Sequence, residues 1–446
     1  MNTPKRTLTN VLLRREISSA ELRQDTPKRA ALAAALLVPG LALTACTPAG
    51  ASAGDTSAAA ASAPEAAAPT QEASRAHPRL AMTYDGGVMV FDAAAGEVVL
   101  DEPLAGFNRV NPAGDGRHVL VSTATGFRVL DTGAWSEPHG DHSHHYTSAP
   151  SLTEAVFPAT TPGHAVVHGG TTALFDDGTG TVQLFDPREL SGLAEGLPQT
   201  TSYVSEHAHH GVALQLQDGS LLVTEGDSES RNGIKVLSAP AADGSRTEIA
   251  HSDDCPGVHG EAALAGETIV VGCEDGLLAY RDARITKIDA PDEYARIGNQ
   301  AGSVESAVVL GDYKTDPDAE LERPTRISLT DTATGTMKLV ELGASYTFRS
   351  LGRGPSGEAL VLATDGTLRV IDPKTAKQAA SIEVMDAWEE PLEWQQPRPA
   401  LYVQGTTAYV TEPATNQLHT IDLVGGRVLG STELPHTPNE FTGIPG

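Results

Sequence analysis

The amino-acid sequence predicts an all-β protein whose folded part is a single β-propeller, and three observations lead to this prediction. A short pattern of strand-forming apolar residues, ending in a polar residue before a turn, recurs eight times at intervals of about 45 residues. Further Val- and Leu-rich segments precede these copies and are separated by turn signals such as Asp-Gly. Residues 77–446 show no sustained helical periodicity. Short strands repeated at this interval are typical of propeller blades.

The eight copies of the pattern define the expected blades. They are VMVFDAAAGE, FRVLDTG, VQLFDPRE, IKVLSAPA, LLAYRDA, RISLTDTATG, LRVIDPKTA and LHTIDLVGG, and the residues after their last apolar position are Asp92, Asp131, Asp186, Ser238, Arg281, Thr330, Asp372 and Asp422. Eight blades are therefore favoured, and seven would follow if one weaker copy were an insertion. A parallel β-helix has coils of about 20 residues, and a β-sandwich would not keep one pattern through so many copies.

The first copy lies too close to the start of the expected domain to have a complete blade before it. The C-terminal tail HTPNEFTGIPG follows the strands of the last repeat. We expect this tail, or the strand before it, to complete the first blade and close the ring. Circular closure would remove the unpaired strand edges of an open ring.

The N-terminal segment resembles a bacterial lipoprotein signal. Lys28 and Arg29 precede about fifteen mostly apolar residues that end in the lipobox-like sequence Leu-Thr-Ala-Cys at Cys46. We expect residues 1–46 to be the signal peptide and lipidated Cys46 to anchor the protein to the outer face of the cell membrane. A single uncleaved anchor helix is the alternative. Residues 47–76, rich in Ala, Ser and Pro, are expected to be a disordered tether before the propeller domain at 77–446.

Charge and cysteine content narrow the possible partners and ligands. The chain has 58 acidic and 31 basic residues and a formal net charge of −27, which argues against nucleic acid as a partner. Outside the cytoplasm, Cys255 and Cys273 are expected to form a disulfide. Ligation of a metal by their thiolates is the alternative. We expect the protein to be a monomer.

The stretch HGDHSHHY concentrates imidazole groups in one place. It carries His139, Asp141, His142, His144 and His145, and it lies in the longest interval between two repeats. We expect a polar inserted loop near residues 136–150 that captures metal ions, with a solvated loop of no function as the alternative. Because metal binding needs neutral imidazoles, capture should weaken as the pH falls below about 6.5.

Other histidines fall at equivalent places in three successive repeats. The segments PGHAVVHGG, EHAHHGVAL and CPGVHGEAAL contain His164, His168, His207, His209, His210 and His259. All of them precede or lie in the first strand of their repeat, which lines the central channel of a propeller. These segments should therefore converge on one mouth of the channel, where three imidazoles would suit Zn²⁺.

The exact ligands of this channel site stay open at the level of sequence. His164 and His168 would share one face of a strand, whereas adjacent His209 and His210 would point to opposite sides, so only one of the latter pair could bind. Glu206 or Glu261 could provide a fourth ligand or orient an imidazole. Copper or nickel could occupy the same imidazoles. Histidines that only line a wet channel are the alternative.

These histidine segments resemble the AztD family of extracytoplasmic zinc metallochaperones. The likeness is carried by HGDHSHHY, PGHAVVHGGTTALFDDGTGTVQLFD, HHGVALQLQDGSLLV and the segment from CPGVHGEA to VVGCEDG. The resemblance implies a β-propeller that holds zinc near its channel, has a His-rich mobile loop, and hands the metal to the solute-binding protein of a zinc ABC transporter. The lipobox and tether depart from this pattern, because they imply a membrane-anchored protein and not a freely diffusing one.

The sequence therefore predicts a metal carrier and not an enzyme. Zn²⁺ would be captured on the His139–His145 loop, pass to the channel histidines, and leave for a transporter's binding protein. An envelope propeller enzyme with hydrolytic zinc and a protein-binding scaffold are the alternatives. The sequence contains no nucleophile elbow and no dense group of carboxylates that would support an enzyme. It also contains no partner motif that would support a scaffold.

Overall fold

The computed structural model describes residues 69–446, and strands make up nearly all of its regular structure. The all-β prediction is therefore confirmed. The expected signal peptide, its Cys46 and the expected tether up to residue 68 lie outside the described residues. A 3-10 helix, η1 (Pro187–Glu195), follows strand β13. Among residues 69–446, no helix combines the length and the apolar character that crossing a bilayer requires.

Eight four-stranded antiparallel sheets make up most of residues 69–446, and we number them along the chain. Sheet 1 contains β35 (Phe441–Ile444), β2 (Arg79–Tyr84), β3 (Gly87–Asp92) and β4 (Glu97–Pro103); sheet 2 contains β5 (Arg109–Pro112), β6 (His118–Thr123), β7 (Gly126–Asp131) and β10 (Ser151–Pro158). Sheet 3 contains β11 (Pro162–His168), β12 (Thr171–Asp176), β13 (Thr181–Phe185) and β14 (Thr201–Val204); sheet 4 contains β15 (Ala213–Gln215), β16 (Leu221–Gly226), β17 (Arg231–Leu237) and β18 (Glu248–Ser252).

The second half of the chain continues the same order. Sheet 5 contains β19 (His259–Leu264), β20 (Thr268–Gly272), β21 (Gly276–Arg281) and β22 (Arg284–Asp289); sheet 6 contains β23 (Gln300–Ala301), β24 (Val308–Asp312), β25 (Arg326–Asp331) and β26 (Thr336–Glu341). Sheet 7 contains β27 (Tyr346–Arg353), β28 (Ala359–Ala363), β29 (Thr367–Asp372) and β30 (Lys377–Glu383); sheet 8 contains β31 (Leu401–Gln404), β32 (Thr407–Glu412), β33 (Gln417–Asp422) and β34 (Arg427–Glu433).

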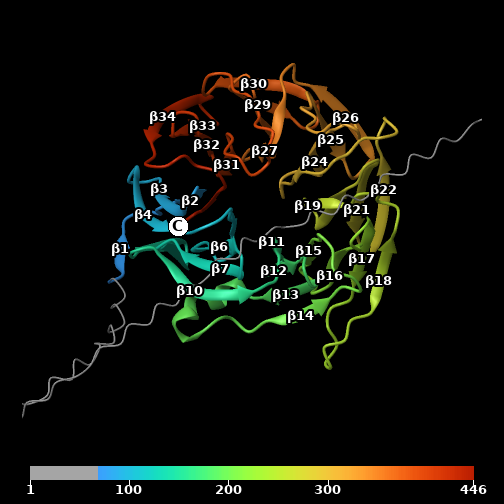
Figure 1. The fold of residues 1–446 in the computed structure, drawn as a ribbon, viewed down its shortest axis with the longest axis horizontal. Helices are drawn as coiled ribbons and strands as arrows, with labels where there is room; N and C mark the ends of the chain where they lie inside the picture. The colour runs from blue at the N-terminus through green and yellow to red at the C-terminus, as the bar shows by residue number, and fades with distance from the viewer. Residues whose placement is uncertain (1–68) are drawn as a thin grey trace, which may run out of the picture. The chain divides into compact units, whose positions relative to one another are not determined.

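The sheets are arranged around a common centre, as in a propeller, with the first strand of each nearest the centre and the last at the rim (Figure 1). The middle strands of each sheet are buried, whereas the rim strands are largely exposed. Apolar side chains pack between neighbouring sheets; for example, Leu222 and Ile234 of sheet 4 share a core cluster with Val271 of sheet 5. The core therefore lies between successive sheets, and the first strands face the common centre.

The recurring sequence pattern corresponds to the third strand of each sheet. Asp recurs at the end of this pattern because its side chain caps the turn that leads to the fourth strand. The Oδ1 atom of Asp92 accepts hydrogen bonds from the backbone N–H groups of Ala94 and Ala95, at 2.8 and 3.0 Å. Asp372 and Asp422 cap the equivalent turns in sheets 7 and 8. An Asp side chain can hydrogen-bond backbone two residues further on, which favours it in such turns.

The C-terminal tail pairs with the first sheet, as the sequence predicts. Strand β35 comes from the tail, and its Ile444 lies opposite Arg79 of β2. Sheet 1 also packs against sheet 8, since Leu80 and Met89 share a core cluster with Leu418. The last strand of the chain thus provides the innermost strand of the first sheet.

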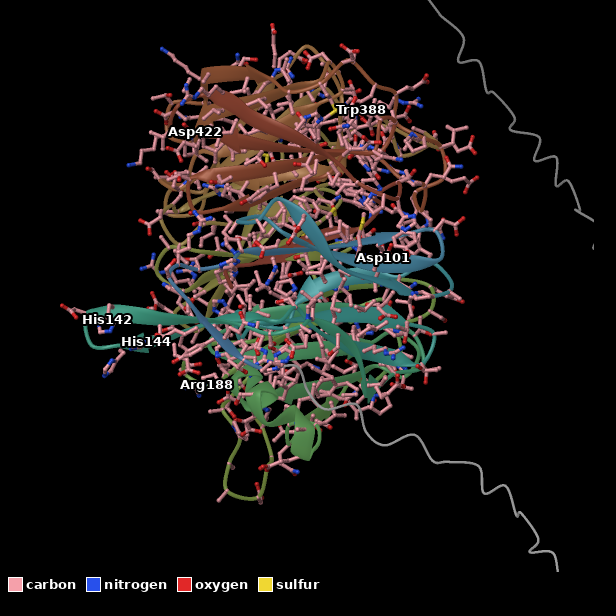
Figure 2. All side chains as sticks on the ribbon, turned by 90° about the vertical axis from the view of Figure 1, so that its left-hand side faces the viewer. Asp101, His142, His144, Arg188, Trp388 and Asp422 are labelled. Carbon is pink, nitrogen blue, oxygen red and sulfur yellow. A yellow bond between two sulfur atoms is a disulfide. The ribbon has the colours of Figure 1, made fainter. Side chains whose placement is uncertain are left out.

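Antiparallel pairing gives the assembly two distinct faces. Connections from the first to the second strand, and from the third to the fourth, leave at one face; connections from the second to the third strand, and from sheet to sheet, leave at the other. We call these the hairpin face and the crossover face. In Figure 2, Asp422 and His142 lie toward the hairpin face, on the left, whereas Trp388 lies toward the crossover face, on the right.

Regular structure begins earlier than the sequence predicts. Strand β1 (Gln71–Ala73) lies inside the range expected for a disordered tether, and it pairs with β9 (His142–Thr147). Backbone hydrogen bonds to a neighbouring strand can order a short segment that lacks large apolar side chains. Residues 71–73 of the expected tether thus form part of the three-stranded sheet with the hairpin.

Candidate metal centre

Three histidines from successive sheets converge at the crossover face. The ligand atoms of His164, His210 and His259 lie within 4.8 Å of one another, and the Nε2 atoms of His210 and His259 are 3.3 Å apart. We call these residues the histidine trio. The starts of the first strands of three neighbouring sheets therefore place these imidazoles side by side.

The positions of the trio follow from local irregularities at the start of these strands. His210 precedes β15 in the connection from sheet 3. The pairing of β11 with β12 shifts register between Pro162 and Ala165, where His164 lies. The pairing of β19 with β20 shifts in the same way after His259, at Gly260, whose φ is 69°. Such bulges redirect side chains out of the regular alternation of a strand.

Each imidazole of the trio is oriented by an acceptor at Nδ1. That atom lies 2.9 Å from the Gly211 carbonyl oxygen in His164 and 2.6 Å from the Gly298 carbonyl oxygen in His259. A carbonyl oxygen can only accept, so both Nδ1 atoms carry the proton and both Nε2 atoms present a lone pair. Nδ1 of His210 lies 2.6 Å from the carboxylate of Asp177. Zinc-binding histidines are commonly held in this way.

The electrostatic environment keeps His164 and His259 neutral. Burial, together with the charges of His210, His259 and Arg109, holds the pKa of His164 well below its usual range. Burial also lowers the pKa of His259 to about 4, against a raising effect of its hydrogen bond to Gly298. Neutral imidazole is the form that binds a metal ion. At pH 7 these two imidazoles are therefore ready to bind without first releasing protons.

Changing Asp177 to Asn is expected to weaken zinc binding about 10- to 100-fold, because changes to residues that orient metal ligands typically cost that much. The amide keeps the size of the side chain but loses the charge that stabilises the His210 N–H donor. Chelator competition at pH 7 measures the affinity. Asp186→Asn is a matched control, since its carboxylate pairs with exposed Arg188 away from the trio. Equal affinities for both variants would show that Asp177 does not orient a ligand.

His168 and His209 do not belong to the trio. Nε2 of His168 bonds to Glu267 at 2.9 Å, at the opposite end of β11, about 13 Å along the strand from His164. His209 is buried against Phe175, and its ring nitrogens contact the His207 and Thr224 carbonyl oxygens at 2.9 and 3.2 Å. Of each pair, His164 and His210 are the members whose ligand atoms belong to the converging group. Since β11 runs from the crossover face to the hairpin face, its two histidines lie at opposite faces.

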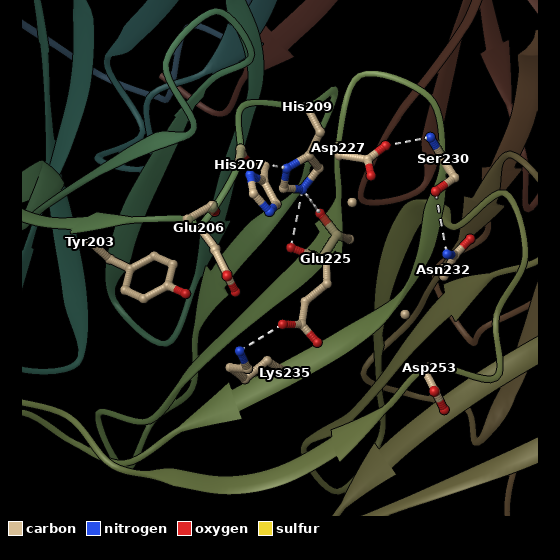
Figure 3. A pocket seen from close by; sticks show the side chains of 14 residues that line it. Tyr203, Glu206, His207, His209, Glu225, Asp227, Ser230, Asn232, Lys235 and Asp253 are labelled. Atoms are coloured by element: carbon tan, nitrogen blue, oxygen red, sulfur yellow. Dashed lines mark hydrogen bonds and ion pairs between the residues drawn. The ribbon is translucent and has the colours of Figure 1, made fainter.

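The two glutamates considered as further ligands lie outside the trio. Glu206 lines a separate pocket beside His209, with His207, Glu225 and Asp227 around it (Figure 3). In that pocket Glu225 pairs with Lys235 at 2.6 Å. Glu261 follows His259 on β19, and burial raises its pKa to about 7. Neither belongs to the group of converging ligand atoms in residues 69–446.

The predicted disulfide between Cys255 and Cys273 is present, with an S–S distance of 2.01 Å. It links the segment before β19 to the end of β20, and both half-cystines are buried. The paired sulfurs are not thiolates, so the alternative of metal ligation by these cysteines is wrong for this structure. The bridge joins the two segments that position His259.

The His-rich stretch is a β-hairpin and not an irregular loop. Strands β8 (Ala134–His139) and β9 pair across a two-residue turn, Gly140-Asp141, in which Gly140 has a φ of 63°. Polar side chains are compatible with this arrangement because backbone hydrogen bonds to β8 and β1 form the three-stranded sheet. The hairpin is inserted between the third and fourth strands of sheet 2, and it overlaps the range 136–150 expected for an insertion.

Side chains alternate between the two sides of a strand, so the histidines of the hairpin lie on different sides. His139, His142 and His144 share one side, their ligand atoms lie within 4.8 Å of one another, and Nδ1 of His139 is 3.3 Å from Nε2 of His144. We call them the hairpin cluster. Nδ1 of His144 bonds to Glu72 of β1 at 2.8 Å. His145 points to the other side and bonds to Ser136, and exposed Asp141 contacts His142 at 3.3 Å.

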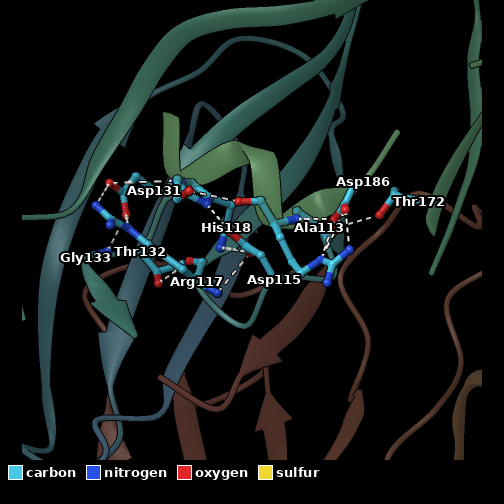
Figure 4. A network of polar contacts seen from close by, with 11 residues as sticks. Ala113, Asp115, Arg117, His118, Asp131, Thr132, Gly133, Thr172 and Asp186 are labelled. Carbon is cyan, nitrogen blue, oxygen red and sulfur yellow. Dashed lines mark hydrogen bonds and ion pairs between the residues drawn. The ribbon is translucent and has the colours of Figure 1, made fainter. Parts of the chain in front are cut away.

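Polar contacts at the base of the hairpin fix it to sheet 2. Arg117 forms two hydrogen bonds with Asp131, at 2.8 and 2.6 Å, in the network shown in Figure 4. Its guanidinium also lies 4.0 Å from the ring centre of Trp135, the second residue of β8. Asp131 further accepts a hydrogen bond from Gly133 at 2.9 Å. The hairpin is thus attached to the propeller-like body by a charged, stacked contact.

The hairpin cluster and the trio open onto opposite faces. The hairpin leaves a third strand and projects from the hairpin face (Figure 2), whereas the trio lies where first strands begin, at the crossover face. The sequence predicts that metal passes from the His-rich segment to the channel histidines; because the two clusters lie at opposite faces, such a passage would need more than one ligand exchange.

The chain is similar to known zinc chaperones. No family model matches it. The zinc chaperone AztD of Citrobacter koseri is 25% identical over 375 residues, which cover 80% of this chain and 84% of that protein. A crystal structure of Citrobacter koseri AztD has a TM-score of 0.70 at 23% identity and covers 83% of this chain and 98% of that one. The apo structure of that AztD has a TM-score of 0.67 at 22% identity, with the same coverage. Similarity in sequence over most of the chain, together with the shared fold, confirms the resemblance to the AztD-type zinc chaperone family that the sequence predicts.

Proposed function

We propose that this protein is an extracytoplasmic zinc metallochaperone that binds Zn²⁺ as cargo at the histidine trio and transfers it to the solute-binding protein of a zinc ABC transporter. The observation that carries the proposal is the preorganised trio, with oriented Nδ1 atoms and ligand atoms that lie within 4.8 Å of one another. The zinc chaperone name of the curated relative supports it. We infer a non-catalytic role for this protein, because the same relative is named a zinc chaperone and not an enzyme.

The proposal includes a circularly closed propeller of eight blades, one for each four-stranded sheet. Its support is the pairing of β35 with β2 and the core cluster shared by sheets 1 and 8. We further propose that lipidated Cys46 holds this domain at the outer face of the cell membrane. A rigid ring keeps the three first strands in fixed relative positions, which a site built from three sheets requires.

The hairpin cluster is proposed as a second, weaker zinc site. Its imidazoles are more exposed than those of the trio, so bulk water competes more strongly and more side-chain entropy is lost on binding. Because it lies at the opposite face, we propose that it exchanges metal with its surroundings independently of the trio.

Transfer to the acceptor is the direct test of the proposed function. The full chain, loaded with one equivalent of zinc, is mixed with the metal-free solute-binding protein in the presence of a chelator that removes free zinc. The two proteins are then separated, and the zinc content of each is measured over time. A chaperone delivers zinc to the acceptor faster than the chelator intercepts it. Delivery no faster than release to the chelator alone would contradict the proposal, and zinc-dependent turnover of an activated ester would instead support a hydrolase.

Changing His139, His142 and His144 together to alanine is expected to remove the weaker zinc site and to leave the affinity of the trio unchanged within about twofold. Sites that are far apart and share no partners usually act additively. Zinc stoichiometry and affinity are measured by calorimetric titration and by chelator competition. A tenfold loss of affinity at the trio would show that the two clusters are coupled and would contradict their independence.

A further inference from the structure

The trio offers three ligands, whereas Zn²⁺ in proteins is almost always bound by four. Within residues 69–446, the converging group contains no carboxylate. Two carboxylates of the depression beside His210 are already engaged: Asp177 holds His210 at 2.6 Å, and Glu274 lies 3.5 Å from Arg296. The fourth position is therefore left for a ligand from outside these residues.

Positive charge from arginine side chains acts on the trio. The charges of Arg296 and Arg231 both act on His259, and that of Arg109 acts on His164. The open depression beside His210 is lined by Arg231. Arg231 is partly buried. Within the described part of the chain, its guanidinium forms no ion pair or hydrogen bond. Its positive charge disfavours binding of the metal ion alone. The same charge, with its free hydrogen-bond donors, favours an anion that binds together with the metal.

Carboxylate is the class of anion that fits this depression. A carboxylate oxygen binds zinc at about 2.0 to 2.2 Å, and its second oxygen can accept from a guanidinium, whose planar fork matches that group. The depression is also lined by Asp177, Asp227, Glu229 and Glu274. These charges repel a doubly charged phosphate more strongly than a singly charged carboxylate.

We propose that the trio binds zinc as a mixed complex in which an external carboxylate takes the fourth position, with one oxygen on the metal and the other hydrogen-bonded to Arg231. The inference rests on the proposed function, because it describes how the cargo is held. The carboxylate comes either from a free organic acid or from an Asp or Glu side chain of another protein. In the second case, the acceptor itself would begin the ligand exchange.

The test uses the full chain with His139, His142 and His144 changed to alanine, loaded with Co²⁺ so that the visible spectrum reports only the trio. Acetate and a blocked tripeptide containing Glu are titrated at constant ionic strength. Both should change the spectrum in a saturable way. Tighter binding of the peptide would indicate a protein carboxylate, and equal binding a free acid.

Arg231→Gln is expected to weaken acetate binding about tenfold, the loss expected for one charge-assisted hydrogen bond, with Co²⁺ affinity in the absence of acetate not reduced. Arg188→Gln, on the hairpin face, is the control and should bind acetate like the parent. A spectrum that acetate and the peptide leave unchanged would overturn the inference, as would an Arg231→Gln variant with unchanged acetate affinity. If Co²⁺ does not bind the trio at all, the proposed function itself fails.

Discussion

Replacing His164 by alanine is expected to remove tight zinc binding, whereas replacing His168 by alanine on the same strand is expected to leave it intact. Nδ1 of His164 bonds to the Gly211 carbonyl oxygen, which leaves Nε2 for the metal, and His168 bonds to Glu267 at the other end of β11. Loss of one ligand of three should reduce the affinity by more than about 100-fold, since even residues that only orient ligands cost up to that amount. Chelator competition on the full chain measures the difference.

A second matched pair comes from adjacent residues. His210→Ala should lose zinc affinity with little loss of stability, because this imidazole is exposed. His209→Ala should do the reverse: its buried ring contacts Phe175 and Thr224, and its loss leaves a cavity and unpaired polar groups. Urea denaturation gives the stability. Equal losses of zinc affinity in both members of either pair would mean that the trio is not the binding site.

The sequence was sufficient to predict which strands bring the histidines together. A repeat of short strands implies that first strands meet at the channel, so histidines at the same place in three repeats must converge. The choice between His164 and His168 could not be made in this way. It depends on the bulge between Pro162 and Ala165. Gly163 lies within this bulge, and glycine inside a strand often marks one, but its residue type does not say which histidine is redirected.

The residues that orient the trio were not predicted. Asp177 follows β12, and Gly298 precedes β23, so each comes from a connection at the crossover face. Asp177 could have been found, because the turn after a second strand opens at the same face as the start of a first strand. Gly298 acts through its carbonyl oxygen. Every residue has this group, so the sequence does not indicate which residue makes such a contact.

The hairpin shows where composition misleads. HGDHSHHY is too polar to resemble a buried strand, yet β9 forms through backbone pairing with β8 and β1. Its place between a third and a fourth strand fixes the face from which it projects. Asp131 ends the third strand of its repeat, so the order of strands alone is enough to place the hairpin at the face opposite the channel histidines.

The metal-free protein is expected to lose stability as the pH falls from about 6.5 to about 4, and bound zinc is expected to prevent part of this loss. The pKa of His259 is lowered to about 4 in the folded chain, whereas an unfolded histidine titrates near 6.5. Between these values the unfolded chain binds more protons, so the free energy of unfolding decreases as the pH falls. A shift of this size corresponds to about 3 kcal/mol once the pH is below both values. His164 acts in the same direction.

Urea denaturation at pH 7 and pH 4.5 checks this expectation on the wild type and on His259→Gln, which keeps a donor for Gly298 but does not titrate. The variant should lose less stability between the two pH values than the wild type. His251→Gln is the control, since His251 lies on rim strand β18 and pairs with Glu225. Zinc bound at Nε2 excludes the proton, so the zinc-loaded wild type should resemble the variant until the metal is released. Parallel pH profiles for wild type and His259→Gln would show that burial of this imidazole does not couple folding to protonation.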